Sequence, residues 1–213
     1  MFYFEEINHY KVLKSDLLND VNHCFTTRGV GKDIFGTNVI SPIQTHSDNV
    51  EFVDKRLEYP ETDGLIVTQK NIPIALRFAD CTPLIFYDTK QKMGAVSHAG
   101  WRGTVQKIGV KTIQKMGSLP KDIVAIIGPA IGLCCYEVSD DVREKLLNTI
   151  SSTIGLTEDR NVDLKQINKR QLEEIGVTKI DICPYCTSCN NDLFYSYRKE
   201  NGTANRHYAL LML

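Results

Sequence analysis

Residues 79–104 read Ala-Asp-Cys-Thr-Pro-Leu-Ile-Phe-Tyr-Asp-Thr-Lys-Gln-Lys-Met-Gly-Ala-Val-Ser-His-Ala-Gly-Trp-Arg-Gly-Thr, and the fold is organised around this stretch. Two apolar runs, Pro83–Tyr87 and Met93–Val96, flank the polar segment Asp88–Lys92. Apolar runs on either side of a short polar segment are typical of two strands joined by a turn. The sequence therefore predicts a β-hairpin at the centre of the chain.

Two residues at the outer ends of this hairpin bear on function. Cys81 ends the first predicted strand and His98 ends the second, and a two-residue turn at Thr89-Lys90 would place them directly opposite each other. Opposed residues in an antiparallel pair share a face, with Cβ atoms about 4.5–5.5 Å apart, whereas a slip of one residue would put them on opposite faces. A thiol beside an imidazole can form a metal site or an activated nucleophile. A buried cysteine and a chance histidine are the ordinary interpretation.

The composition is that of an ordinary globular chain. Its 213 residues have a formal net charge of −1 and are 42% hydrophobic, which fits a single domain over residues 1–213. A charge near zero gives no support for nucleic acid or an anionic membrane as the main partner. No apolar run approaches the roughly 18 residues of a membrane span, and the acidic segment Met1–Ile7 is unlike a signal peptide. We expect a cytoplasmic protein whose seven cysteines are thiols or ligands rather than disulfides.

Three segments have helical periodicity. The first begins just after Gly100-Trp101-Arg102-Gly103, with Val105, Ile108, Ile113 and Met116 on one face, and ends at Gly117; the second runs from Ser139 to about Ser151; the third covers Val162–Ile175 with Asn161 as its cap. The first amides of the first helix, with Arg102, would point toward the sheet end that carries His98. That geometry suits a phosphate group, and an ordinary surface arginine is the alternative.

Strand-like segments alternate with these helices. They are Leu65–Val67, Ile72–Phe78, Ile123–Ile127 and Lys179–Ile182. Both ends of the chain are typical of hairpins: one lies within residues 2–13, and the other joins Leu193–Arg198 to His207–Leu213 through a Glu-Asn-Gly turn at 200–202. We therefore predict an α/β (α+β) domain with a mixed sheet.

Three cysteines near the C-terminal end, Cys183, Cys186 and Cys189, could begin an iron–sulfur or zinc site. The ferredoxin pattern needs a fourth cysteine followed by proline, whereas Asn190 and Asn191 follow Cys189. No second Cys-x-x-Cys pair exists elsewhere to complete a four-cysteine zinc site. We therefore expect ordinary thiols here rather than a separate metal site.

A stronger case comes from combining His46, Cys81 and His98. Each stands at the end or turn of a strand-like segment, where side chains can converge on one sheet edge. Two imidazoles and one thiolate bind zinc with a fourth position open to water, whose pKa the metal lowers toward neutrality. Copper accepts the same ligands. The spacing along the chain follows no local metal motif, so the prediction depends on residue types.

Several motifs together resemble the laccase-domain family, first called multicopper polyphenol oxidase. They are Gln44-Thr-His46, Thr62-Asp-Gly-Leu65, Ala79-Asp-Cys-Thr-Pro-Leu84, Ser97-His-Ala-Gly-Trp-Arg-Gly-Thr104, Ile127-Gly-Pro-Ala-Ile-Gly132 with Cys134-Cys-Tyr-Glu137, and Phe194–Arg198. The resemblance runs from about Asn22 onward and is most specific at Ser97–Thr104. Family members often close with Gly-Arg where this chain has Asn205-Arg206, which leaves the role of Arg206 open.

The resemblance implies a layered α/β/β/α fold, shared with certain toxin cysteine deamidases, and a site at His46, Cys81 and His98 that is both metal-binding and catalytic. The family is described as purine nucleoside phosphorylases that act on adenosine, inosine, guanosine and methylthioadenosine and also deaminate adenosine. Some members are linked to peptidoglycan editing. The resemblance therefore implies zinc, with copper as the alternative, and purine nucleosides and phosphate as partners. A homodimer is compatible with the sequence.

These reactions suggest roles for further residues. Arg28 and Arg102, each next to a glycine, are candidates for phosphate because guanidinium forks match its oxygens. Gln44 is the third candidate substrate-binding residue. Deamination at C6 of adenine needs a carboxylate that moves a proton; Asp80 is the first candidate catalytic carboxylate and Asp63 the second, and either could instead cap a turn.

Other functions are compatible with the same residues. With Cys81 as nucleophile and His98 as base, the protein would be a metal-free cysteine hydrolase or a hydrolase that edits peptidoglycan precursors. A copper polyphenol oxidase would use the two-histidine, one-cysteine set of blue-copper sites, although laccase chemistry normally needs more copper sites than five histidines supply. A zinc-stabilised binding domain without turnover is the remaining alternative.

Overall fold

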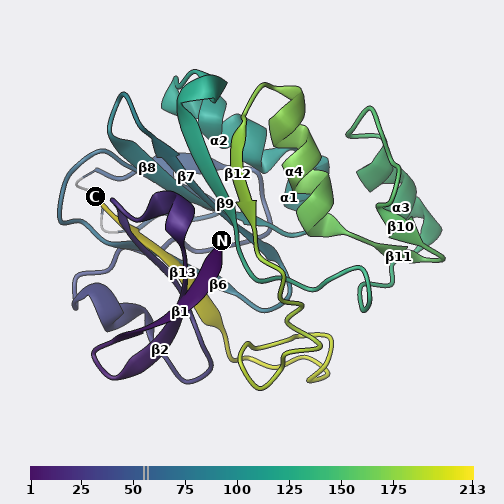
Figure 1. The fold of residues 1–213 in the computed structure, drawn as a ribbon, viewed down its shortest axis with the longest axis horizontal. Coiled ribbons are helices and arrows are strands. Elements are labelled where there is room, and N and C mark those ends of the chain that lie inside the picture. Colours follow the sequence, from purple (N-terminus) through teal and green to yellow (C-terminus); the bar gives the residue numbers. More distant parts are fainter. Residues whose placement is uncertain (55, 57) are drawn as a thin grey trace.

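The computed structural model describes residues 1–54, 56 and 58–213. Within them the chain folds into a mixed α/β structure with sheets of five, six and two strands (Figure 1). The strands are β1 (Phe2–Ile7), β2 (Tyr10–Ser15), β3 (Asn22–Thr26), β4 (Val50–Phe52), β5 (Gly64–Val67), β6 (Ile74–Phe78), β7 (Thr82–Asp88), β8 (Met93–Ala99), β9 (Ile123–Ile127), β10 (Thr157–Glu158), β11 (Asn161–Val162), β12 (Lys179–Ile182) and β13 (His207–Met212). The helices are α1 (Trp101–Val105), α2 (Ile108–Met116), α3 (Asp140–Leu147) and α4 (Leu164–Glu174), and the short 3-10 helices are η1 (Asp16–Leu18), η2 (Lys32–Phe35) and η3 (Pro120–Asp122).

The two large sheets differ in their pairing. The six-stranded sheet has the order β12-β9-β7-β8-β5-β4, with parallel pairs at both edges and antiparallel pairs between them. It is the mixed sheet that the sequence predicts. The five-stranded sheet, β1-β2-β3-β13-β6, is antiparallel throughout, which the prediction of mixed sheets did not include.

The main core lies between these two sheets. Phe25 and Leu76 from the five-stranded sheet belong to one buried cluster with Ile85 and Val96 from the six-stranded sheet. Helices α2 and α4 cover the other face of the six-stranded sheet, where Phe86 is buried with side chains of both helices (Figure 1). The apolar sequences of β7 and β9 follow from this, since strands covered on both faces need no polar alternation. Each such buried side chain stabilises the fold by about 1.5–3 kcal/mol.

The central hairpin forms, but its turn is longer than predicted. Asp88 pairs with Met93 and Pro83 with His98, so four residues form the loop instead of two. The Asp88 carboxylate accepts the amides of Lys90 at 2.7 Å and Gln91 at 2.8 Å, which closes the loop as an Asx turn. The register is therefore shifted by two residues. Since two is an even number, the shift does not exchange the faces of the strands.

The first predicted helix is in fact two. Helix α1 begins at Trp101, within the glycine motif, and the left-handed backbone of Lys107 (φ 56°) separates it from α2. The break changes the direction of the apolar side chains. Val105 packs with Leu146 of α3, whereas Ile113 packs on the six-stranded sheet. The predicted single apolar face is thus divided between two neighbours.

The ends of the other two predicted helices also differ. Helix α3 ends at Leu147, short of the predicted Ser151. Helix α4 is capped by Asp163, whose carboxylate accepts the Gln166 amide at 3.0 Å, a contact worth about 1 kcal/mol. Asn161, the predicted cap, lies in β11 instead. Asp163 caps the helix in place of Asn161 because its side chain can accept the amide of Gln166, three residues later in the first turn.

The two predicted terminal hairpins have opposite outcomes. β1 and β2 pair as predicted, through a turn in which Asn8 and His9 both have positive φ. The C-terminal hairpin prediction was wrong. β13 lies between β3 and β6 and pairs antiparallel with both, while residues 193–198 form turns rather than a strand. The apolar side chains of β13 gain more burial in the middle of a sheet than at its edge.

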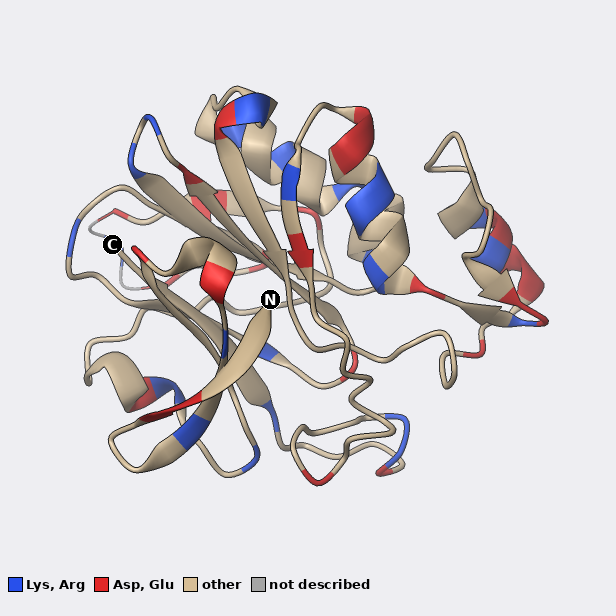
Figure 2. Cartoon of the chain, in the orientation of Figure 1, with Lys and Arg blue, Asp and Glu red and all other residues tan. Residues whose placement is uncertain are grey.

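Charged residues of both signs are interspersed on the surface helices. Figure 2 shows acidic and basic positions on both α3 and α4, with the acidic positions of α4 at its C-terminal end. This mixture agrees with the formal net charge of −1. Among the helices in the described residues, none has the length and apolar character that crossing a membrane requires.

Candidate active site

His46, Cys81 and His98 lie together at one end of the six-stranded sheet, and we call them the histidine–cysteine cluster. Their ligand atoms are all within 4.8 Å of one another. His98 is in β8, Cys81 directly precedes β7, and His46 lies in the loop before β4. The two imidazole rings are 4.8 Å apart and meet edge to face. The three residues that the sequence singles out are thus brought to one point.

Asp63 organises two members of the cluster. Its buried carboxylate accepts a hydrogen bond from His98 Nδ1 at 2.7 Å and from the backbone amides of Thr45, His46 and Ser47 at 3.1, 3.2 and 2.7 Å. A histidine whose Nδ1 donates to a carboxylate has Nε2 free as a ligand. The same carboxylate holds the loop in which His46 has a left-handed φ of 63°. Asp63 thereby fixes His98 directly and His46 through its backbone.

The cluster forms a mutually stabilising pair of charges. Burial by itself raises the pKa of the Cys81 thiol, but the His98 charge and hydrogen bonds from both histidines outweigh it and lower the pKa to about 6. Burial lowers the pKa of His98, yet the Cys81 thiolate and Asp63 raise it to about 9. Burial alone would raise the pKa of Asp63. Its hydrogen bonds to His98 and Ser47 have the larger effect, and the net result is a lowered pKa. At neutral pH these groups favour a thiolate beside an imidazolium.

Gly100 leaves the space that the cluster needs. A Cβ at this position would lie 2.9 Å from Cys81 Sγ and 3.2 Å from His46 Cδ2. Real Cβ atoms do not approach so closely, so a larger residue would displace the sulfur or the ring. Gly100 stands within the most specific motif, but nothing in the sequence indicates this role.

The cluster opens into a cavity of about 520 Å³, which is within the usual range of about 300–1,000 Å³ for small-molecule sites. Its wall includes three arginines, two tyrosines and one carboxylate, namely Arg77, Arg198, Arg206, Tyr136, Tyr197 and Asp80. The arginines that form ion pairs in the described part of the chain are others: Arg28, Arg56, Arg143 and Arg160. The cavity therefore presents three cationic groups to an anionic ligand.

The two arginines predicted to bind phosphate do not line this cavity. Arg28 forms an ion pair with Glu200 at 2.7 Å and donates to the Asn191 carbonyl at 2.7 Å. Arg102 is exposed and lies over the Trp101 ring, 4.3 Å from its centroid. Helix α1, whose amides were expected to complete a phosphate cradle, has only five residues. Their binding roles stay predictions, and the structure gives both side chains other contacts.

Gln44 does line the cavity, and its amide is also structural. The side chain donates to the Arg77 carbonyl at 3.0 Å and accepts the Arg77 amide at 2.9 Å. It therefore extends the hydrogen bonding of β6 and fixes the backbone from which Arg77 projects. A direct contact with substrate stays a prediction.

Asp80 lines the cavity and connects it to a distant loop. One carboxylate oxygen accepts the Thr187 hydroxyl at 2.6 Å, and the other accepts the Arg198 amide at 2.7 Å. Asp80 has a left-handed φ of 81° and is largely buried. It thus holds the segment that brings Arg198 to the cavity, in addition to any part in catalysis.

The arginines and tyrosines that line the cavity were not predicted as site residues from the sequence. Arg77 is the single charged residue in an otherwise apolar strand, which is a signal for an outward-facing functional position. Tyr136 and Arg198 stand inside the quoted motifs, but nothing in their spacing indicates that they meet. Arg198 lies over Tyr136 at 5.6 Å from the ring centroid and donates to the Glu137 carbonyl at 2.9 Å. Only the folded chain brings these segments together.

Two of the C-terminal cysteines meet a second pair of cysteines, although the sequence has no second Cys-x-x-Cys pair. Cys186 and Cys189 meet Cys134 and Cys135, and the four sulfurs lie within 4.8 Å of one another; we call them the four-cysteine cluster. Cys183 is buried in the main core instead. The Cys-x-x-Cys pattern does not indicate these partners, because they are adjacent residues on a different loop.

Comparison with known proteins places the chain among related sequences. Residues 22–213 match the family model described as multi-copper polyphenol oxidoreductase laccase. The chain is 36% identical over 198 residues to purine nucleoside phosphorylase YlmD of Bacillus subtilis, covering 82% of this chain and 71% of that protein. It is 31% identical over 170 residues to the human purine nucleoside phosphorylase LACC1, covering 74% of this chain and 40% of that protein.

Two solved structures have the same fold. The crystal structure of YlmD from Geobacillus stearothermophilus superposes with a TM-score of 0.87 at 27% identity and covers 98% of both chains. The Bacillus licheniformis protein YfiH superposes with a TM-score of 0.86 at 29% identity, covering 99% of this chain and 98% of the other.

Proposed function

Because this chain belongs to the family described as multi-copper polyphenol oxidoreductase laccase, we propose that it is a metal-dependent purine nucleoside phosphorylase that also deaminates adenosine. Relatives at 31–36% identity bear the name purine nucleoside phosphorylase. One observation carries the assignment to this chain. The histidine–cysteine cluster opens into a cavity whose wall holds three arginines without carboxylate partners in the described residues.

The arginines provide a site for phosphate. In phosphorolysis an oxygen of phosphate attacks C1′ of the ribose, the C1′–N9 bond breaks, and the purine leaves with the bonding electrons and takes up a proton. Arg77, Arg198 and Arg206 would bind and orient the phosphate, since their guanidinium groups match its oxygens in charge and geometry. We propose these three in preference to Arg28 and Arg102, which do not line the cavity.

Tyr136 is suited to contact the purine. Burial raises the pKa of its hydroxyl, so the group stays protonated at neutral pH. It can then donate a hydrogen bond to a ring nitrogen on which negative charge develops as the purine leaves. Its position beside Arg198 would put this donor next to the bound phosphate.

The histidine–cysteine cluster suits a metal ion. Two imidazoles and a thiolate, with a glycine where a side chain would intrude, are a donor set for zinc, and copper is the alternative. An ion held by His46, Cys81 and His98 would supply Lewis acidity and lower the pKa of a water molecule. Asp63 would keep His98 oriented as a ligand.

Deamination requires water to add at C6 of adenine and a proton to reach the departing ammonia. Among the cavity-lining residues described, Asp80 is the one carboxylate, and we propose that it moves this proton. Each of its oxygens accepts one hydrogen bond within the protein and has a second lone pair available. Asp63 is the weaker candidate because it has no exposure to the cavity.

We also propose that residues 1–213 form one domain with the layered α/β/β/α arrangement of the family. The shared core between the two large sheets supports this, as do α2 and α4 on the outer face of one sheet. On the outer face of the five-stranded sheet the short helix η2 contributes Ile34 to a smaller cluster.

Product analysis tests the function. Metal-loaded protein is incubated with adenosine, with and without phosphate, and the products are separated by chromatography. We expect phosphate-dependent adenine and phosphate-independent inosine, and neither product from Cys81→Ala. Cys24→Ala is the matched control, because Cys24 is a buried cysteine remote from the cluster. A folded, metal-loaded wild type that converts no adenosine would overturn the proposal.

A second candidate is favoured by geometry alone. Cys81, His98 and Asp63 follow one another as thiol, imidazole and carboxylate, with His98 Nδ1 held by Asp63 at 2.7 Å. This is the order of groups in a cysteine hydrolase. Such an enzyme would hydrolyse its substrate in the presence of a strong chelator and lose activity on alkylation of Cys81. Activity that disappears with the metal instead favours the phosphorylase.

A further inference from the structure

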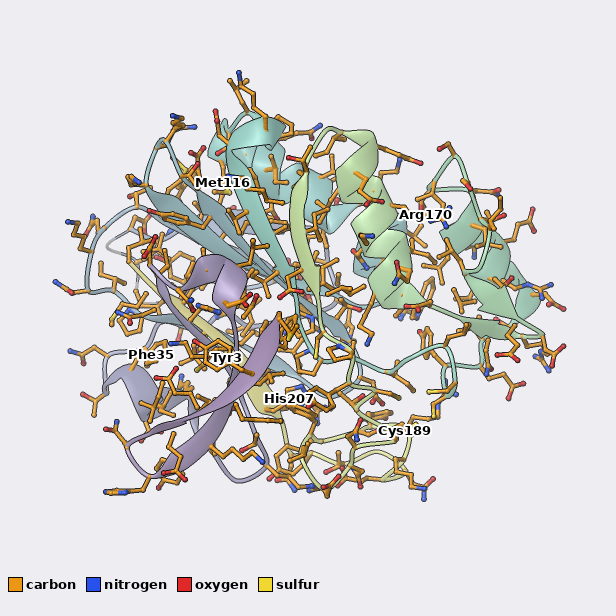
Figure 3. All side chains as sticks on the ribbon, in the orientation of Figure 1. Tyr3, Phe35, Met116, Arg170, Cys189 and His207 are labelled. Atoms are coloured by element: carbon orange, nitrogen blue, oxygen red, sulfur yellow. The ribbon has the colours of Figure 1, made fainter. Side chains whose placement is uncertain are left out.

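The four-cysteine cluster lies outside the cavity and has no part in the proposed reactions. Figure 3 labels Cys189 among the loops, apart from the helices that cover the six-stranded sheet. Its Sγ lies 3.5 Å from Cys134 Sγ and 3.4 Å from Cys135 Sγ, and Cys186 Sγ completes a group within 4.8 Å. All four are free thiols.

The distances between these sulfurs match a single metal ion. Four thiolates around zinc, each at about 2.3 Å, form a tetrahedron whose edges are about 3.8 Å. The sulfur pairs here, at 3.4 and 3.5 Å with the rest inside 4.8 Å, are close to that value. They are far beyond the roughly 2.05 Å of a disulfide. An iron–sulfur cluster would need space for several metals between its thiolates.

The backbone around the cluster is arranged for the sulfurs. The Gly132 amide donates to Cys186 Sγ at 3.2 Å, a contact typical of metal-bound thiolates. A Cβ on Gly132 would lie 3.2 Å from Cys186 Cβ and 3.4 Å from Cys134 Sγ. The Cys135 amide bonds back to the Gly132 carbonyl at 3.0 Å, which turns the chain so that Cys134 and Cys135 face the same point.

The two loops are also joined beside the sulfurs. Ala130 forms a bridge with Cys186, and the Thr187 amide donates to the Ala130 carbonyl at 3.0 Å. The thiols therefore converge from two segments that are already aligned by backbone hydrogen bonds. Alignment of this kind favours binding, because less of the binding free energy is then needed to bring the ligands together.

We propose that Cys134, Cys135, Cys186 and Cys189 bind one zinc ion, with all four positions filled by protein sulfur. A closed tetrahedral set of four thiolates is characteristic of structural zinc sites. The ion would join the loop at 130–137 to the loop at 186–198. Those loops carry Tyr136 and Arg198 to the cavity, so the zinc would brace one wall of it. The site stands independently of the reaction proposed above.

Metal analysis of matched variants tests the site. Wild type, Cys189→Ser and Cys183→Ser are expressed with added zinc and purified without chelator, and zinc and iron are measured per chain by elemental mass spectrometry. We expect Cys189→Ser to hold one zinc fewer per chain than wild type. Cys183→Ser is the control, since Cys183 lies on the same segment but outside the cluster, and it should equal wild type. Equal zinc in wild type and Cys189→Ser, or iron in place of zinc, would overturn the proposal.

A measurement on the unaltered protein covers the case in which Cys189→Ser fails to fold. Cys134 and Cys189 are exposed, so iodoacetamide should modify both in the absence of metal. With zinc bound we expect both to be protected, and a strong chelator should restore their reactivity. Peptide mapping reads out each position. Equal alkylation rates with and without zinc, or a mass lower by two hydrogens that signals a disulfide, would reject the site.

Discussion

The histidine–cysteine cluster and the four-cysteine cluster use sulfur in opposite ways. The first takes its ligands from strand ends, has a buried carboxylate behind it, and opens into a cavity. The second takes its ligands from two loops and surrounds its centre with sulfur on every side. A zinc ion with an open coordination position can bind water or substrate, whereas an ion with four protein ligands has a structural role. If the two proposals hold, the difference teaches that the number and origin of the ligands, more than the presence of a metal, decide what each cluster does.

The largest expected effect separates the two clusters by activity. Cys81→Ala should lower the rate of phosphorolysis by about 10³-fold, since the loss of several kcal/mol of transition-state stabilisation has that size. Cys189→Ser should lower the melting temperature but reduce the rate by less than about tenfold, because its cluster only braces the wall. Initial rates of adenine release and thermal melts measure both. Equal loss of activity in the two variants would contradict a catalytic role for one cluster and a structural role for the other.

The next effect concerns the carboxylate that only the histidine–cysteine cluster has. Asp63→Asn should weaken metal binding there by about 10–100-fold, because a neutral amide stabilises the His98 ligand less. Competition with a chromophoric chelator measures the affinity. Asp48→Asn, on the loop that carries His46 but partly exposed and paired with Lys111, should bind metal as wild type does. An unchanged affinity in Asp63→Asn would mean that orientation of His98 is unimportant.

A lower pH should reduce the free energy of unfolding through His207, which lies in the core behind the histidine–cysteine cluster. His207 is fully buried between Phe78 and Phe194, and burial lowers its pKa to about 3. Below pH 6.5 the unfolded chain binds a proton that the folded chain does not, so stability falls as the pH falls. This histidine should cost about 2 kcal/mol of unfolding free energy between pH 7 and pH 5.

Denaturant unfolding at the two pH values tests this expectation. The loss should be about 2 kcal/mol smaller in His207→Leu than in wild type. His9→Gln serves as the control, since His9 is an exposed turn residue and should leave the pH dependence unaltered. The same pH dependence in wild type and His207→Leu would assign the loss to other groups.

The smallest effect compares the two glycines that make room for sulfur. Gly100→Ala should weaken zinc binding at the histidine–cysteine cluster by about tenfold, because overpacking costs about 1–3 kcal/mol and its Cβ would lie only 2.9 Å from Cys81 Sγ. Gly132→Ala should weaken the four-cysteine cluster less, since its closest contact is 3.2 Å. Zinc retained after dialysis against a weak chelator measures both. Each variant is the control for the other, and a loss at both clusters in either one would indicate general unfolding.

Elements defined by burial could be predicted from the sequence, and elements defined by turns could not. The apolar runs of β7, β8 and β9 mark strands because both faces of the sheet are covered there. The hairpin loop was mispredicted because the Asp88 carboxylate holds the amides of Lys90 and Gln91, so the loop extends over residues 89–92 instead of 89–90. Lys107 gives no sign that it breaks a helix, since lysine is a good helix former.

The candidate site divides in the same way. His46, Cys81 and His98 were predicted because their chemistry is distinctive and each stands near the end of a strand-like segment. The cavity wall was missed because its arginines come from separate parts of the chain and arginine is common on surfaces. The four-cysteine cluster was missed for a related reason. Its two pairs are separated by about fifty residues, and only the fold brings them together.

The position of β13 has a consequence for synthesis. Residues 207–212 fill the gap between β3 and β6, whose own residues are made much earlier. While the chain emerges from the ribosome, both of those strands have an unpaired edge, the condition that invites wrong partners. His207 on β13 also stacks on Phe78, whose ring packs at an angle against His98. The nascent chain can therefore acquire a finished active site only after residue 212 has left the tunnel, so premature termination anywhere upstream should yield inactive, aggregation-prone fragments.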